Sequence, residues 1–135
     1  MPAPSNKSAS REELKQKQAE FSSRVAGILE EDDPLAVYYD YVQWVVNNVP
    51  SNETDTGIAE ILEKATNAFR EESIYKNDLR YLKLWTLRAR QADLSTALSY
   101  YSQLLKNGIG ISYSLLYEEY AKLLEAKGRW AKYCY

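Results

Sequence analysis

Apolar residues recur at helical spacing along most of this chain, and glycine or polar turn residues interrupt them at short intervals. Between Asp93 and Gly108 the leucines, Ala97 and Tyr101 follow the i, i+3, i+4, i+7 pattern of one helix face, and Asn107 with Gly108 is typical of a helix end. No stretch keeps the strict alternation of a half-buried strand for long. We therefore expect an all-α fold of about six helices.

Capping residues predict where the helices begin and end. Ser10 is expected to cap a first helix, and Asp33 followed by Pro34 to begin a second. Two alternatives stay open at each of two later helix starts, Asn77 or Asp78 and Asp93 or Ser95. Gly128 is expected to end the last helix. A loose apolar stripe on the first helix consists of Leu14, Phe21, Val25, Ile28 and Leu29.

The composition excludes several classes of function. The chain has no histidine, which excludes Ser-His and Cys-His catalysis and His-based metal sites. A net charge of −2 gives no electrostatic basis for direct nucleic-acid binding. Cys134 is the single cysteine, so no internal disulfide forms. We expect no catalytic residue, no cofactor and no metal site.

Membrane and secretion signals are missing from the sequence. No apolar run approaches the roughly 20 residues that a membrane span needs. The first ten residues, MPAPSNKSAS, lack the apolar centre of a secretory signal. We expect a soluble intracellular protein that does not contact a membrane.

The last helical unit has the spacing of a tetratricopeptide helix pair. This spacing is large, large, small, large, turn and large, and the residues at these positions are Tyr117, Tyr120, Ala121, Leu124, Gly128 and Trp130. We expect a tetratricopeptide-like right-handed stack of antiparallel helix pairs. The predicted organisation is a disordered tail (1–10), an N-terminal helix (11–30), the tetratricopeptide-like domain (31–132) and a non-native end (133–135).

Four blocks occur in an order and at spacings that resemble a known family. They are DDPLAVYYDYVQWV (32–45), YKNDLRYLKLW (75–85), NGIG (107–110) and LYEEYAKLLEAKGRW (116–130). Together they are similar to the N-terminal homology region of the Bub/Mad spindle-checkpoint family, in a fungal-like version. The structural signature carried by these blocks is Asp33, Pro34, Trp44, Asn77, Asp78, Asn107, Gly108, Gly110, Tyr117, Gly128 and Trp130.

The resemblance implies a scaffold domain of the spindle assembly checkpoint. Such a domain helps kinetochore recruitment and the signalling that delays anaphase. Its partners would be a kinetochore scaffold protein or other checkpoint proteins bound through short motifs, in the nucleus and at the mitotic kinetochore. The chain has no kinase motif, so any serine/threonine kinase would lie C-terminal to it in the full-length parent.

Two features bear on the branch of the family and on the C-terminus. The sequence has no Lys-Glu-Asn tripeptide of the kind that inhibitor-type members carry, which favours the kinase branch. Tyr133 stands where a tetratricopeptide unit needs a small residue, and the chain stops two residues later. We expect a truncated chain with a non-native end.

Tyr81, Trp85 and Arg88 are the candidate partner-binding residues. The resemblance places them on the helix with which vertebrate relatives bind a motif of the kinetochore scaffold. Those relatives carry leucine three and six positions after the tryptophan, where this chain has Arg88 and Gln91. The alternative for Trp85 is ordinary packing between helices.

Two other functions stay open. One is an RNA-processing scaffold of half-tetratricopeptide repeats, which also use Trp and Tyr on paired helices. The other is an enzyme working with carboxylates alone.

Overall fold

The computed structural model describes residues 9–50 and 56–133, with side chains as far as residue 129. In these ranges it contains six α-helices and two short 3-10 helices, and no strand. The chain divides into two compact units, residues 1–65 (unit 1) and 66–135 (unit 2), and each is described by itself. The predicted all-α class is confirmed within these ranges. The predicted disordered tail lies outside the described residues as far as residue 8, and the predicted non-native end does so from residue 134.

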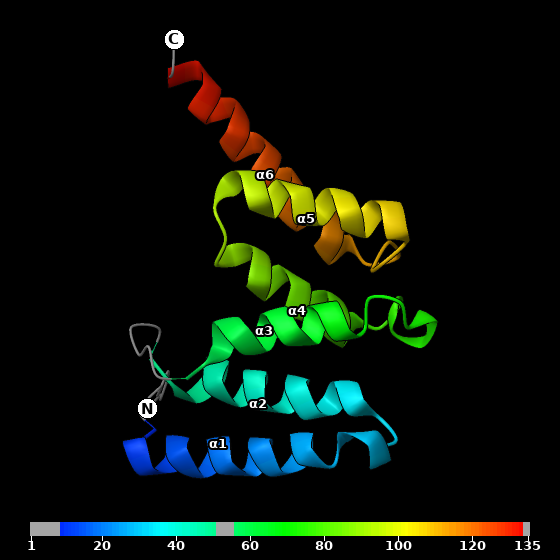
Figure 1. The fold of residues 1–135 in the computed structure, drawn as a ribbon. Helices are drawn as coiled ribbons and strands as arrows, with labels where there is room; N and C mark the ends of the chain where they lie inside the picture. The colour runs from blue at the N-terminus through cyan, green and yellow to red at the C-terminus, as the bar shows by residue number, and fades with distance from the viewer. Residues whose placement is uncertain (1–8, 51–55, 134–135) are drawn as a thin grey trace. The chain divides into compact units, whose positions relative to one another are not determined.

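Unit 1 is built on an antiparallel hairpin of helices α1 (Arg11–Ala26) and α2 (Pro34–Asn48) (Figure 1). The 3-10 helix η1 (Ile28–Glu30) connects them, and α3 (Ile58–Ala68) begins in this unit. Leu14 of α1 is buried against Tyr41 and Val45 of α2. The Phe21 ring stacks on the Tyr41 ring at 4.8 Å, so an aromatic pair closes the hairpin.

The predicted starts of the first two helices are confirmed. Ser10 forms a complete capping box, because the Glu13 N–H donates to Ser10 Oγ (3.1 Å) and the Ser10 N–H to Glu13 Oε1 (2.7 Å). Pro34 occupies the first turn of α2, but the Asp33 carboxylate makes no capping hydrogen bond to that turn. Leu29 departs from the predicted stripe. The α-helix ends at Ala26, which turns Leu29 outward and leaves it 98% exposed.

Unit 2 contains α4 (Leu79–Arg90), α5 (Leu94–Asn107) and α6 (Ser114–Tyr133), preceded by the 3-10 helix η2 (Ser73–Tyr75). Asp78 and Asp93 cap α4 and α5, which decides the two open alternatives. Gly108 ends α5 with a left-handed φ of 71°, as predicted. The fully buried side chains of this unit include Tyr81, Leu82, Leu84, Trp85, Tyr101, Leu104, Ile109 and Leu116.

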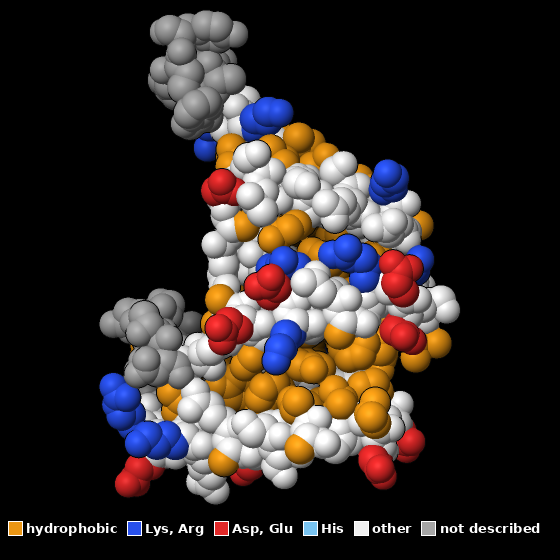
Figure 2. All heavy atoms as spheres, viewed as in Figure 1, with side chains coloured by type: hydrophobic (Ala, Val, Ile, Leu, Met, Phe, Trp, Pro, Cys, Tyr) orange, Lys and Arg blue, Asp and Glu red, His pale blue; other side chains and the backbone are white. Residues whose placement is uncertain are grey.

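Two expectations about the last helix need correction. Gly128 does not end it, since α6 runs without a break to Tyr133. A glycine inside a helix costs only about 1 kcal/mol relative to alanine, and the neighbours of Gly128 are good helix formers. Tyr117 and Leu124, expected to pack inward, are 47% and 48% exposed. Hydrophobic side chains of this part of the chain reach the surface (Figure 2).

Candidate functional site

Helix α4 carries all three candidate partner-binding residues. Its N-terminus is fixed by Asp78, whose carboxylate accepts a hydrogen bond from the Arg80 N–H at 2.9 Å. The Arg80 guanidinium folds back on the same carboxylate, with distances of 3.1 Å from Nε and 2.7 Å from Nη2. This bidentate ion pair fixes the start of the helix and neutralises the charge of Arg80.

Tyr81 and Trp85 are core residues, 0% and 2% exposed. Their rings meet edge to face, with centroids 6.4 Å apart. The Tyr81 hydroxyl donates a hydrogen bond to the Thr66 carbonyl oxygen. Burial raises the pKa of Tyr81, although the nearby Trp85 indole opposes the change. The indole Nε1 itself satisfies no hydrogen-bond geometry with any described residue. Neither side chain offers surface to a partner in this structure.

Arg88 is the candidate that keeps a partly exposed side chain. Its guanidinium carbon lies 5.2 Å from the centroid of the Trp85 ring and 4.6 Å from that of Tyr100, close enough for cation–π attraction to both. Arg88 Nη1 donates to Thr66 Oγ1 at 2.9 Å and to Asn67 Oδ1 at 3.2 Å. The guanidinium is therefore held in one place by two aromatic rings and two neutral acceptors.

The other cations of α4 differ in their degree of neutralisation. Arg90 Nη2 lies 3.2 Å from Glu119 Oε1, and Lys122 Nζ lies 3.3 Å from Glu119 Oε2. Burial opposes ionisation of Glu119, but these two cations outweigh it and hold its pKa below the ordinary value. Within residues 9–50 and 56–129, Arg88 forms no ion pair with a carboxylate. Of the three arginines of α4, Arg80 and Arg90 pair with carboxylates, whereas Arg88 is held by rings and neutral acceptors among the described residues.

The NGIG block works as a structural clamp next to α4. The Gly110 N–H donates to the Lys76 carbonyl oxygen at 2.7 Å, and the Tyr113 hydroxyl donates to the Asn77 carbonyl oxygen at 2.7 Å. A Cβ on Gly110 would lie 2.9 Å from Leu82 Cδ1, and its φ is +72°. Asn77 and Gly110 of the signature therefore fix the turn before α6 against the start of α4.

Two further signature residues, Tyr117 and Trp44, have surroundings that the structure describes. The Tyr117 hydroxyl donates to the Ile111 carbonyl oxygen at 2.6 Å and so closes the same turn. Trp44 lies half-buried at the edge of the unit 1 cluster. The Trp130 side chain is not among the described ones.

Sequence reasoning missed the residues that hold Arg88. Thr66 and Asn67 lie 22 and 21 positions before it, and Tyr100 lies on the next helix. No motif marks them, because the contact depends on how three helical segments pack. The described residues include no group of His, Cys, Asp and Glu that could hold a metal ion. The helices in that same part of the chain are also too short or too polar to cross a membrane.

Comparisons with known proteins match this chain to spindle-checkpoint proteins, the family that its sequence blocks resemble. The family model described as Mad3/BUB1 homology region 1 matches residues 15–134. The mitotic spindle checkpoint component mad3 of Schizosaccharomyces pombe is 39% identical over 102 residues, covering 75% of this chain and 32% of the relative. The mitotic checkpoint serine/threonine-protein kinase BUB1 beta of Mus musculus is 31% identical over 125 residues, covering 93% and 12%. The chain therefore spans a third or less of these curated relatives.

Two solved structures share the fold. A chain in the crystal structure of the mitotic checkpoint complex matches with 34% identity and a TM-score of 0.72, covering 88% of this chain and 62% of that one. The conserved N-terminal domain of the mitotic checkpoint component BUB1 matches with 26% identity and a TM-score of 0.74, covering 87% and 61%. These matches favour the checkpoint interpretation over an RNA-processing scaffold. The relatives include mad3 and BUB1-type kinases, so the choice of branch stays a prediction.

Proposed function

Because the chain belongs to the Mad3/BUB1 homology region 1 family, we propose that it is the protein-interaction scaffold domain of a spindle assembly checkpoint protein. The domain helps recruit its parent to the kinetochore and supports the signalling that delays anaphase. The observation that carries this proposal is the family match over residues 15–134 together with the shared all-α fold. The site of action is the nucleus and, in mitosis, the kinetochore.

The chain itself supplies binding rather than catalysis. It matches an N-terminal domain of BUB1 and has no kinase motif. In the kinase branch of the family, the serine/threonine kinase of the parent lies beyond this domain.

Arg88 is the contact residue of the proposed docking site. Tyr81 and Trp85 act through the shape of the core beneath it, and Trp85 with Tyr100 holds the guanidinium plane. A planar guanidinium with donors left over recognises a carboxylate in a bidentate manner. The partner motif therefore presents an acidic side chain to α4, from a kinetochore scaffold protein or another checkpoint protein.

The test compares the tagged full-length protein with two charge reversals. Arg88→Glu repels an acidic motif, whereas Lys106→Glu makes the same change on the exposed surface of α5. We expect Arg88→Glu to lower co-purification of kinetochore components from mitotic cells about tenfold. Lys106→Glu should leave it unchanged. Urea unfolding of both variants checks that the fold is kept.

The outcomes separate the two parts of the proposal. A well-folded wild-type protein that captures no kinetochore component and does not localise to kinetochores contradicts the checkpoint function. Equal capture by wild type and Arg88→Glu leaves that function standing and rejects Arg88 as its contact residue.

A further inference from the structure

The α1–α2 hairpin of unit 1 carries a second surface with binding geometry, away from α4 in the sequence. A hollow of about 70 Å³ lies between the two helices, and a second of about 270 Å³ lies along α1. Lys17, Glu20 and Trp44 line both hollows. We define the Trp44 notch as these three residues together with Glu13, which lines the second hollow.

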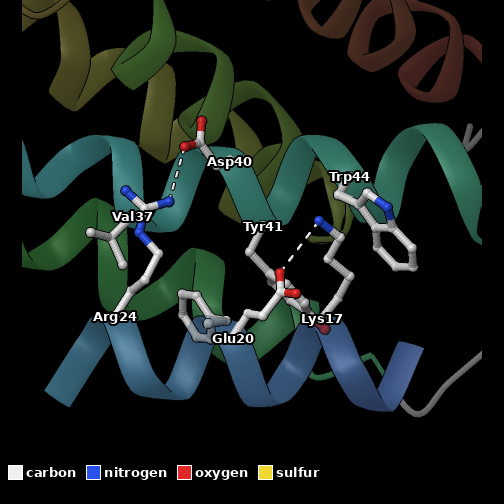
Figure 3. Close-up of a pocket in the computed structure, with 8 residues that line it drawn as sticks. Lys17, Glu20, Arg24, Val37, Asp40, Tyr41 and Trp44 are labelled. Atoms are coloured by element: carbon white, nitrogen blue, oxygen red, sulfur yellow. Dashed lines mark hydrogen bonds and ion pairs between the residues drawn. The ribbon is translucent and has the colours of Figure 1, made fainter. Parts of the chain in front are cut away.

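An internal cation already occupies the Trp44 notch. Lys17 Nζ lies 5.8 Å from the centroid of the Trp44 ring and 3.4 Å from Glu20 Oε1 (Figure 3). An aromatic face with a carboxylate beside it is the arrangement that binds an ammonium or guanidinium group. The position of Lys17 therefore shows which chemistry the notch accepts.

The contacts of Lys17 are weak enough for another cation to replace its ammonium group. The Lys17 and Glu20 side chains are 41% and 54% exposed, and ion pairs at such positions contribute little in water. Lys17 sits on a flexible stem, so its ammonium can move to solvent when another cation arrives.

The neighbouring charges favour a basic ligand. Arg24, the other cation at the first hollow, is engaged by Asp40 at 3.0 Å and by Glu31 at 3.9 Å. Figure 3 shows Arg24 turned toward Asp40, on the side of the hollow away from Trp44. Glu13 adds a second carboxylate to the notch, with Oε1 held by the Ser10 N–H. Displacing Lys17 leaves two carboxylates around one aromatic ring.

We propose that the Trp44 notch binds a lysine or arginine side chain from a basic segment of a partner protein, in place of Lys17. Trp44 supplies the face of the ring, and Glu20 and Glu13 supply the carboxylates. This surface is independent of the docking site on α4, and its chemistry is the opposite, because α4 presents a cation.

The experiment titrates the full chain with the capped peptide Gly-Lys-Gly-Arg-Gly-Lys and with its glutamate counterpart, in which Glu replaces every Lys and Arg. Nitrogen-resolved NMR follows the indole N–H of Trp44, assigned with the Trp44→Phe variant. The indole of Trp85, buried in unit 2, is the internal reference. We expect the basic peptide to shift the Trp44 signal and added salt to weaken the binding.

Two matched pairs of variants test the mechanism. Lys17→Met removes the competing cation and should tighten binding about threefold, while Glu20→Gln should weaken it about threefold. The controls are Lys15→Met and Glu12→Gln, which make the same charge changes on α1 outside the notch. They should alter affinity much less.

Three results would overturn the proposal. The first is no shift of the Trp44 indole with the basic peptide. The second is a shift with the glutamate peptide instead, which would make Lys17 and Arg24 the binding groups. The third is an equal effect of the control variants, which would reduce the binding to net charge.

Discussion

Replacing Tyr101 by phenylalanine should stabilise unit 2. Tyr101 is 1% exposed, and its hydroxyl is buried without a hydrogen-bond partner among the described residues. Its ring stacks on Tyr120 at 5.8 Å, a contact that phenylalanine keeps. Only the unpaired hydroxyl is lost, so the substitution removes a cost rather than an interaction.

The expected gain follows from two opposing free energies. Burying a hydroxyl without a partner costs about 1–3 kcal/mol. Removing its oxygen leaves a void of roughly 12 Å³, which costs about 0.3 kcal/mol. The net change in the free energy of unfolding is a gain of about 0.7–2.7 kcal/mol.

Tyr81→Phe is the matched control in the same unit. It also removes one buried hydroxyl, but this hydroxyl donates to the Thr66 carbonyl oxygen. Losing that bond should destabilise unit 2 by about 1–2 kcal/mol. Both variants remove one buried tyrosine hydroxyl in unit 2. The sign of the change in the free energy of unfolding therefore depends on whether that hydroxyl makes a hydrogen bond.

Urea unfolding followed by circular dichroism measures both variants. A destabilised Tyr101→Phe protein, or equal effects of the two substitutions, would refute the reasoning. Alkaline pH gives a second readout, because burial raises the pKa of Tyr101 above its ordinary value of 10.0. The wild type therefore loses stability as the pH rises above 10.0, and Tyr101→Phe should lose less.

Two further predictions concern the turn before α6 and an acidic residue on that helix. Gly110→Ala should destabilise the protein by about 2–4 kcal/mol. Alanine at this position would have to adopt a left-handed φ, and its Cβ would clash with the Leu82 side chain. Gly108→Ala should cost only about 1 kcal/mol, since nothing lies within 4 Å of its Cβ, and equal melting points for the two would contradict the steric argument. For Glu119 the lowered pKa means that stabilisation is present above the ordinary value of 4.5 and is lost as the pH falls through the lower folded-state pKa. Glu119→Gln should therefore flatten the acid limb of melting temperature against pH, and an unchanged limb would contradict this.

Local chemistry allowed most helix boundaries to be predicted. A capping box or a proline in the first turn acts within four residues, as at Ser10 and Pro34, and its signal is complete in the sequence. The end of α5 at Gly108 was predictable for the same reason, because glycine adopts the left-handed conformation of a helix C-cap without strain. The predicted helix end at Gly128 was wrong. It came from a repeat pattern and not from local energy, and good helix formers flank this glycine.

The candidate site was only partly predictable. The sequence placed three residues on one helix and left packing between helices open for Trp85, but it did not separate the buried Tyr81 and Trp85 from the partly exposed Arg88. Burial depends on which neighbours cover each face. Apart from Trp85, which lies three residues before it, the partners of Arg88 come from positions more than ten residues away in both directions along the chain.

The amino-acid sequence by itself determined the helical class, the caps and the family, since periodicity and motif spacing are properties of the chain order. Tertiary structure decided that the Arg88 guanidinium lies against both the Trp85 and the Tyr100 ring, and that the Lys17 ammonium lies over the Trp44 ring. The physical reason is that burial and the cation–π contacts of Arg88 with Tyr100 and of Lys17 with Trp44 depend on distances of a few ångströms between separate helices, and those distances exist only after packing.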